Sequence, residues 1–173
     1  TTTGGTQTYG DAVALKSDMV VTGSTVSFLD AVTGGAKALT VTGNAVLGNG
    51  DVADTVTGVT TLSVSGTSSV GASLIDTSSS QTYTGAITLA SQVALTTLDS
   101  DIRINTSLDA QTNGGQSLTV NQGLGTLYVN GTLGGLTKLS SLTITGRADL
   151  TYGVSTTGTQ VYSGGITLLT NSS

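Results

Sequence analysis

One nine-residue motif recurs three times in this chain and constrains its fold more than any other feature. It reads Gln-Thr-Tyr-Thr-Gly-Ala-Ile-Thr-Leu at residues 81–89, and variants of it occupy residues 7–15 and 160–168. The copies begin roughly 75 residues apart, which is too regular for chance and too long for a tight local array. Self-similarity at a fixed period is typical of repeat architectures. We therefore expect one repeated scaffold, with copies at residues 7–80 and 81–159 and a partial copy at residues 160–173.

The composition favours strands around a narrow core. Thr, Ser and Gly supply 35, 21 and 25 of the 173 residues, whereas aromatic residues make up 3% and Pro is absent. β-Branched residues prefer strands, and Gly favours turns. Disordered chains have high charge and few β-branched residues, but only 9% of this chain is charged. Val, Ile, Leu and Ala must therefore fill the interior.

The charge and the missing residue types argue against several functions. The net charge is −5 and all ten acidic residues are Asp, which leaves no basic surface for nucleic acid or anionic lipid. The chain lacks His, Cys and Glu, so it has no disulfide framework and few of the usual catalytic groups. No apolar run approaches the roughly 18 residues of a membrane helix. The start lacks the pattern of a signal peptide and has no Met, so we expect a segment of a longer protein.

Short apolar–small–apolar triplets recur along the chain and suggest a common register. They begin at Val13, Leu39, Leu62, Ile87, Leu118, Leu142 and Ile166. Their spacing averages roughly 25 residues, and the interval from Ile87 to Leu118 is the longest. Short strands of this period, separated by Gly-rich corners, predict an all-β parallel β-solenoid of seven coils of roughly 25 residues, three coils per repeat. The long interval predicts an enlarged coil, looped out near residues 98–101.

In this register, each triplet places two apolar side chains inside the coil and the residue between them outside. The predicted core residues are Val13, Leu15, Leu39, Val41, Leu62, Val64, Ile87, Leu89, Leu118, Val120, Leu142, Ile144, Ile166 and Leu168. A β-sandwich and a set of immunoglobulin-like modules are the alternatives. Both would have poorly filled cores, because the chain has few aromatic residues and no Trp.

The motif at residues 81–89, with the Leu-Thr-Val triplets at residues 39–41 and 118–120 and the Gly-Gly turns, resembles the β-strand repeats of large bacterial exoproteins. These are the filamentous-haemagglutinin-like proteins, which are exported by two-partner secretion. The resemblance extends over residues 7–168. It implies a right-handed parallel β-helix in the shaft of an extracellular adhesin. The secretion domain and the receptor-binding tip of such a protein would lie outside this segment.

We therefore expect a non-enzymatic segment, without a cofactor, that forms the rigid shaft of a secreted bacterial cell-surface adhesin or stalk. Its partners would be neighbouring repeats or identical subunits, and the adhesin would bind a host or cell-surface glycan or protein. The alternative is a self-assembling extracellular filament or sheath subunit that stacks end to end, because solenoid ends expose unpaired strand edges. A third hypothesis, a polysaccharide-active enzyme, would need clustered carboxylates, for which Asp99 and Asp101 with Arg103 are the candidates.

Two further kinds of site have weaker signals. Asp51 and Asp54, in and after a Gly-Asn-Gly-Asp turn, resemble part of a calcium-binding loop, since hard cations bind oxygen ligands. The turn occurs once, which favours a plain turn over a metal site. N-glycosylation sequences begin at Asn105, Asn130 and Asn171, about as many as the composition gives by chance.

Two patterns of outward residues also need a structural explanation. The Thr-x-Thr pairs at residues 40–42 and 143–145 suggest an ice-binding face, but residues 63–65 and 119–121 break that array. Tyr9, Tyr83 and Tyr162 recur with the motif and form either a carbohydrate-stacking row or structural corners. We expect the corner role.

Overall fold

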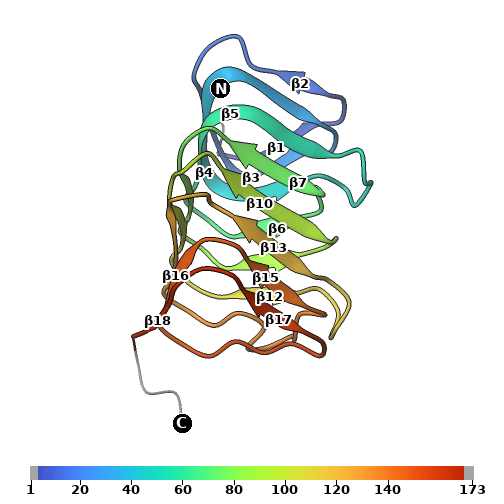
Figure 1. Ribbon diagram of the computed structural model, residues 1–173. Coiled ribbons are helices and arrows are strands. Elements are labelled where there is room, and N and C mark those ends of the chain that lie inside the picture. The colour runs from blue at the N-terminus through green and yellow to red at the C-terminus, as the bar shows by residue number, and fades with distance from the viewer. Residues whose placement is uncertain (1–3, 170–173) are drawn as a thin grey trace.

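The computed structural model describes residues 4–169 and shows one continuous parallel β-solenoid, with the two ends of the chain at opposite ends of the rod (Figure 1). Residues 4–169 contain strands and turns but no helix. The strands of successive coils pair in parallel, and the described residues make about eight turns. The predicted parallel β-helix is thereby confirmed. At about 4.8 Å per coil, the rod is roughly 38 Å long.

Each turn has three faces, which follow one another in the order 1, 2, 3. Face 1 consists of β1 (Thr6–Tyr9), the ends of β3 (Met19–Phe28) and β4 (Val32–Leu47), β6 (Ser68–Val70), β9 (Ile87–Leu89) and β12 (Leu108–Ala110). Single bridge residues, Leu133 and Val154, continue face 1 after β12. Face 2 consists of β2 (Val13–Ala14), the starts of β4 and β5 (Thr55–Val64), β7 (Leu74–Thr77), β10 (Val93–Thr97), β13 (Leu118–Asn121), β15 (Leu142–Ile144) and β17 (Gln160–Tyr162).

Face 3 consists of the start of β3, the middle of β4, the end of β5, β8 (Gln81–Tyr83), β11 (Ile102–Ile104), β14 (Thr126–Val129), β16 (Arg147–Leu150) and β18 (Ile166–Leu168). Met19 and Ile166 are the first and last members of one inward column on face 3, and the chain makes seven turns between them. One coil therefore averages roughly 21 residues, at the lower end of the range for stacked structural repeats. The coil length predicted from the triplets was too long, and the predicted number of coils was correspondingly too small.

The triplet register read from the sequence is wrong, because triplets occur on all three faces. Only two successive pairs in the predicted alignment are true neighbours, Leu39 with Leu62 and Leu118 with Leu142. Strands that stack on one another are three faces apart along the chain. In the other four steps the two triplets are four faces apart, so they lie on different faces. The step from Ile87 to Leu118, for example, runs from face 1 to face 2 of the next coil.

The extra residues of the enlarged coil lie in a different connection from the predicted one. Residues 98–101 form an ordinary short turn between β10 and β11. The long connection is the segment of residues 111–117 between β12 and β13. The long interval from Ile87 to Leu118 therefore combines a fourth face with this longer corner.

The long repeat does not correspond to three coils. The three copies of the motif lie on different faces, with Gln7 on face 1, Gln81 on face 3 and Gln160 on face 2. Each copy is eleven faces after the previous one, which is three full turns and two faces. The copies consequently do not stack on one another.

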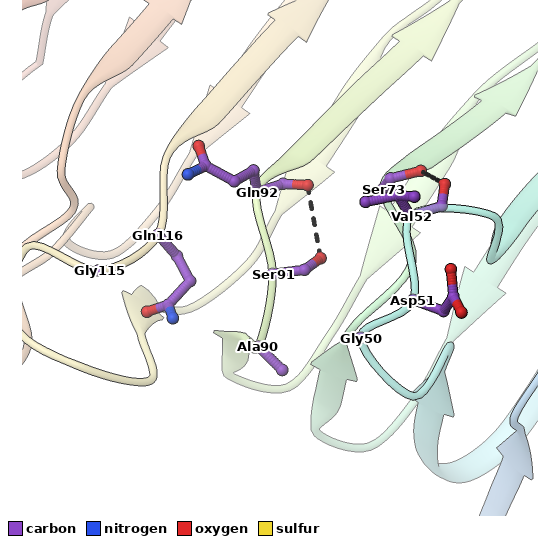
Figure 2. Close-up of a pocket in the computed structure, with 9 residues that line it drawn as sticks. All are labelled: Gly50, Asp51, Val52, Ser73, Ala90, Ser91, Gln92, Gly115 and Gln116. Atoms are coloured by element: carbon purple, nitrogen blue, oxygen red, sulfur yellow. Dashed lines mark hydrogen bonds between the residues drawn. The ribbon is translucent and has the colours of Figure 1, made fainter.

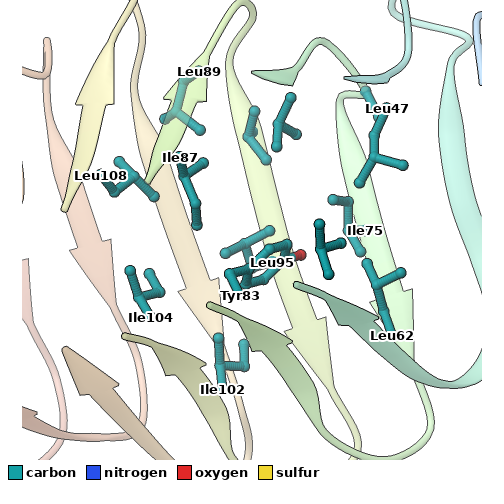
Figure 3. Close-up of a cluster of buried hydrophobic side chains, with 14 of the residues drawn as sticks. Leu47, Leu62, Ile75, Tyr83, Ile87, Leu89, Leu95, Ile102, Ile104 and Leu108 are labelled. Carbon is teal, nitrogen blue, oxygen red and sulfur yellow. The ribbon is translucent and has the colours of Figure 1, made fainter. Parts of the chain in front are cut away.

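The core is a set of inward columns that run along the rod, and Figure 3 shows side chains from all three faces meeting in it. Eleven of the predicted core residues are buried: Leu15, Leu39, Val41, Leu62, Val64, Ile87, Leu89, Leu118, Val120, Leu142 and Ile144. Val13 and Ile166 are partly buried against the core. Leu168 was also predicted as core, but it is 68% exposed, because no described strand stacks on the last coil.

Glycine is required where the corner between faces 3 and 1 brings successive coils close together. Gly43 has a φ of 125°, and a Cβ atom there would lie 1.8 Å from the carbonyl oxygen of Gly23. A Cβ at Gly85 would lie 2.4 Å from the carbonyl oxygen of Gly66 in the coil before it. No real Cβ fits at such distances, so this corner depends on residues without a side chain.

Candidate functional site

Asp99, Asp101 and Arg103, the candidate residues of the enzyme hypothesis, lie where face 2 turns into face 3. Asp101 Oδ2 and Arg103 Nη2 are 2.8 Å apart, and the Arg103 guanidinium carbon lies 4.2 Å from the centre of the Tyr128 ring in the next coil. The Arg103 and Asp101 side chains are 46% and 35% exposed. An ion pair this exposed contributes about 0–1 kcal/mol to stability.

Both carboxylates of this cluster also bind the backbone of the next coil. Asp99 Oδ1 accepts the Leu124 N–H at 2.8 Å, and Asp101 Oδ1 accepts the Thr126 N–H at 3.0 Å. Asp99 has a φ of 53°, a conformation that Asp tolerates better than most residues. These contacts support a structural role for both residues, because each carboxylate links one corner to the corner of the next coil by a hydrogen bond.

The turn that resembles a calcium-binding loop closes on itself. Asp54 is 3% exposed, and its Oδ2 accepts the Asn49 N–H at 2.7 Å. Asp51 Oδ1 accepts the Ala53 N–H at 3.0 Å, and the Asp51 carbonyl oxygen accepts the Asp54 N–H at 3.1 Å. Among residues 4–169, no group of three or more His, Cys, Asp or Glu side chains is arranged to hold a metal ion. Both Asp residues thus support the connection from β4 to β5.

A hollow of about 320 Å³ lies along the corner between faces 1 and 2 (Figure 2). It is lined by turns of successive coils, which contribute Gly50, Asp51, Val52, Ser73, Ala90, Ser91, Gln92, Gly115 and Gln116. Ser73 Oγ donates to the Val52 carbonyl oxygen and Ser91 Oγ donates to the Gly71 carbonyl oxygen, each at 2.8 Å. These lining residues include no aromatic ring for a sugar to stack on, and both hydroxyls tie neighbouring coils together. The hollow therefore supports no particular ligand.

The three Gln–Tyr pairs of the repeated motif form hydrogen bonds on the inward side of the solenoid. Their members are two residues apart on β1, β8 and β17, so both side chains of a pair lie on the same side of the strand. The Tyr Oη donates to the Gln Oε1 in each pair, at 3.3 Å for Tyr9, 3.0 Å for Tyr83 and 2.7 Å for Tyr162. The expectation that these tyrosines mark corners is wrong, because all three are strand residues.

In the first two pairs, the carboxamide nitrogen of the Gln donates to a backbone carbonyl group further along the chain. Gln7 Nε2 donates to the Thr22 carbonyl oxygen at 2.7 Å, and Gln81 Nε2 donates to the Thr96 carbonyl oxygen at 2.8 Å. Each acceptor lies two faces further around the coil than its Gln. Gln81 Nε2 also donates to the Ile75 carbonyl oxygen at 3.1 Å. Gln81 therefore connects its strand to chain segments both before and after it.

Stacking decides how deeply a Gln–Tyr pair is buried. Gln81 and Tyr83 are both 0% exposed, and burial raises the pKa of the Tyr83 hydroxyl far above its usual 10.0. At the last coil, Gln160 is exposed and its Nε2 donates to Thr156 Oγ1 at 3.3 Å. Partial burial raises the pKa of Tyr162 as well. The same motif is thus core in one coil and surface in another.

Asp109 and Gln122 are among the buried polar residues that were not predicted from the sequence. Asp109 is 8% exposed, and its Oδ1 accepts the N–H groups of Leu136 and Thr137 at 2.8 and 3.2 Å. Gln122 is 0% exposed, and its Nε2 donates to the Arg147 carbonyl oxygen at 2.5 Å. A charged residue in the centre of an apolar triplet is the signal that could have identified Asp109. Nothing in the local sequence marks Gln122.

The N-glycosylation sequences and the Thr-x-Thr pairs, which the sequence did not establish as sites, are scattered over the solenoid. Asn105 and Asn130 are exposed at the corner after β11 and β14, whereas Asn171 lies outside the described residues. Residues 40–42 lie on face 3, but Thr143 lies on face 2, so the two Thr-x-Thr pairs do not share a flat surface. On face 3, the outward row of small polar residues is interrupted at Arg103 and Tyr128.

Within residues 4–169, no helix is long and apolar enough to cross a membrane. Comparison with known protein families, with curated proteins and with solved structures finds no match for this chain. The parallel β-solenoid fold is what the structure establishes for this chain.

Proposed function

We propose that this chain is a non-enzymatic, rigid segment of the shaft of a secreted bacterial cell-surface adhesin or stalk. The observation that carries the proposal is the uninterrupted parallel pairing from β1 to β18, which makes one rod without a break between its repeats. In such an array each coil binds only its neighbours, so length is added without a new kind of interface. A shaft needs this property.

The side-chain contacts also fit a structural segment. The carboxylates considered for catalysis accept backbone N–H groups of the next coil, and the hydroxyls that line the corner hollow bind neighbouring turns. Polar groups with such partners stabilise the fold and are less available to a substrate. The resemblance of the repeats to filamentous-haemagglutinin-like exoproteins supplies the extracellular setting of the proposal.

Binding and shape measurements on the isolated chain would test the shaft. Small-angle X-ray scattering would give the shape, and a glycan array together with binding of the fluorescently labelled chain to host cells would give the ligand activity. A shaft predicts a rod roughly 38 Å long and no saturable binding, because the receptor-binding tip of the adhesin would lie elsewhere. Saturable binding to one glycan or cell type would identify the segment as a recognition region instead.

The location can be tested independently with antibodies raised against the chain. Intact cells of the source organism should bind them, and protease added outside the cells should remove the signal. Antibody signal that appears only after the cells are permeabilised would contradict a cell-surface shaft.

A further inference from the structure

Face 3 carries a patch of large and charged outward side chains over three successive coils. Its members lie in two outward columns that run along the rod. The first column holds Asp101, Thr126 and Arg147, and the second holds Arg103, Tyr128 and Asp149. Both arginines of the chain are therefore on this one surface, which we call the face 3 patch.

The charges of the face 3 patch alternate between the two columns. In the first of its coils the acid is in the first column and the base in the second, as Asp101 and Arg103. Two coils later the order is reversed, with Arg147 in the first column and Asp149 in the second. Asp101 and Arg103 pair within the chain, whereas among residues 4–169 neither Arg147 nor Asp149 belongs to an ion pair. Arg147 is exposed and Asp149 is half-buried, so both can meet an outside partner.

This alternation makes the patch complementary to itself. We propose that the face 3 patch binds the same patch of a second copy of this chain, with the two rods side by side and parallel. A twofold axis that runs along the rod between the columns places each column opposite the other column of the second copy, at the same level. Asp101 then lies opposite Arg103 of the second copy, and Arg147 lies opposite Asp149 of the second copy. Opposite charges meet at both levels, and each contact occurs twice.

The middle coil of the patch favours parallel rods over antiparallel rods. In the parallel pair, the large Tyr128 side chain lies opposite the small Thr126 side chain of the second copy. A twofold axis across the rod would also join opposite charges, because it places Asp101 opposite Arg147. It would, however, place Tyr128 against Tyr128 and leave a gap between the two Thr126 side chains. Specific interfaces pack their central residues as densely as protein interiors, which favours the parallel pair.

The other coils of face 3 allow the two rods to approach each other. Before the patch, the outward residues of both columns are small, and they are Ala38, Thr40, Thr61, Ser63, Ser80 and Thr82. Asp18 is the other charged residue of the columns. Its Oδ1 accepts the Ala38 N–H at 2.9 Å, and it lies opposite Val20 of the second copy, so no like charges meet there.

The size of face 3 indicates a weak association. A four-residue strand such as β14 is roughly 13 Å long, and the rod is roughly 38 Å long. Contact along the whole face would bury about 500 Å² on each copy, or about 1,000 Å² in total, which is near the lower limit for specific interfaces. The pair therefore dissociates at low concentration.

Sedimentation equilibrium over a range of concentrations tests the association. The average mass should rise from the 17.0 kDa of one chain towards that of two chains as the concentration approaches about 1 mM. A mass that stays at 17.0 kDa at every concentration would overturn the proposal.

Arg147→Asp tests the surface, because it converts two contacts between opposite charges into two contacts between like charges. It should weaken association by about tenfold or more. Lys138→Asp is the matched control, since it changes the net charge by the same amount at an exposed residue of the corner between faces 1 and 2. This control should associate like the unchanged chain, and circular dichroism should show that both variants are folded. Equal effects of the two variants on association would overturn the proposal.

The double variant Arg147→Asp/Asp149→Arg tests the orientation of the rods. In the parallel pair it exchanges the two charges and again joins opposite charges, so the affinity lost in Arg147→Asp should return. In an antiparallel pair the exchanged charges would lie opposite Asp101 and Arg103 and would repel them. A folded double variant without this recovery would overturn the parallel pair.

Discussion

The pairs Gln81–Tyr83 and Gln160–Tyr162 have the same local geometry but opposite surroundings. In both pairs the tyrosine hydroxyl donates to the glutamine carboxamide oxygen, at 3.0 and 2.7 Å. The first pair is 0% exposed between two coils, whereas Gln160 is exposed on the last described coil. The motif therefore sets the conformation of a strand, and the stacked neighbour sets how much that strand contributes to stability. Each experiment below compares an interior coil with the last coil or with the exposed corners.

The largest expected effect comes from a charge in one inward column of face 3. Val64 and Leu168 belong to this column and are 0% and 68% exposed. Val64→Asp should destabilise the fold by about 4–5 kcal/mol, because it buries an unpaired carboxylate. Leu168→Asp should change stability by about 0.5 kcal/mol or less. Urea unfolding followed by circular dichroism measures both, and similar losses in the two variants would contradict the difference between interior and end.

Removing the glutamine should have the next largest effect. Gln81→Leu keeps the approximate volume of the side chain but leaves the Tyr83 hydroxyl and two backbone carbonyl groups without their partner. Unsatisfied buried groups should destabilise the chain by about 2–3 kcal/mol. Gln160→Leu is the matched control and should be close to neutral. If Gln81→Leu is also neutral, the buried pair is not a stabilising contact.

Alkaline pH should distinguish the two tyrosines. Burial raises the pKa of Tyr83 above the 10.0 of the unfolded chain, so the folded state retains a proton that the unfolded state loses. This contribution to stability is fully present below pH 10 and falls by about 1.4 kcal/mol per pH unit above it. Tyr83→Phe should remove that slope, and Tyr162→Phe should change it less because its side chain is only partly buried. Unfolding free energies measured between pH 8 and pH 11 would show whether the slopes differ in this order.

A substitution at the exposed corner between faces 2 and 3 should have the smallest effect on the free energy of unfolding. Asp101→Ala removes an exposed ion pair and the acceptor of the Thr126 N–H, which should lower stability by about 1 kcal/mol. Asp109→Ala is the buried comparison and should lower it by about 2 kcal/mol, since two N–H groups lose their acceptor. A larger effect of Asp101→Ala than of Asp109→Ala would contradict the view that burial decides these contributions.

The fold could be predicted because its signal is local. Triplets such as those at Leu39 and Leu118 place two apolar side chains on one side of a short strand, and Gly-rich corners follow them. The register could not be predicted, because all three faces carry the same kind of triplet. The step from Leu39 to Leu62 covers three faces and the step from Leu62 to Ile87 covers four, yet the two intervals are almost equal in length. Spacing alone therefore does not separate them.

The role of the Gln–Tyr pair could not be predicted from the sequence for a different reason. The acceptors of Gln81 Nε2 include the backbone carbonyl groups of Ile75 and Thr96, and a carbonyl group is present at every position of the chain. Only the folded coil shows which of them lie within hydrogen-bond distance. The candidate acids at residues 99 and 101 were recognised as a cluster from the sequence, but their backbone partners in the next coil were not.

The three-faced register is the central claim, and paired cysteines test it most directly in a chain that has none of its own. Ser63 and Thr82 are register partners on face 3, and the Cα atoms of neighbouring strands are about 4.8 Å apart, within the range of a disulfide. Under mild oxidation, the double variant Ser63→Cys/Thr82→Cys should form a disulfide within one chain, as mass spectrometry would detect. The alignment of triplets by spacing alone places Ser63 beside Thr88 instead, which the structure puts on face 1. A disulfide in Ser63→Cys/Thr88→Cys, with none in Ser63→Cys/Thr82→Cys, would contradict the register.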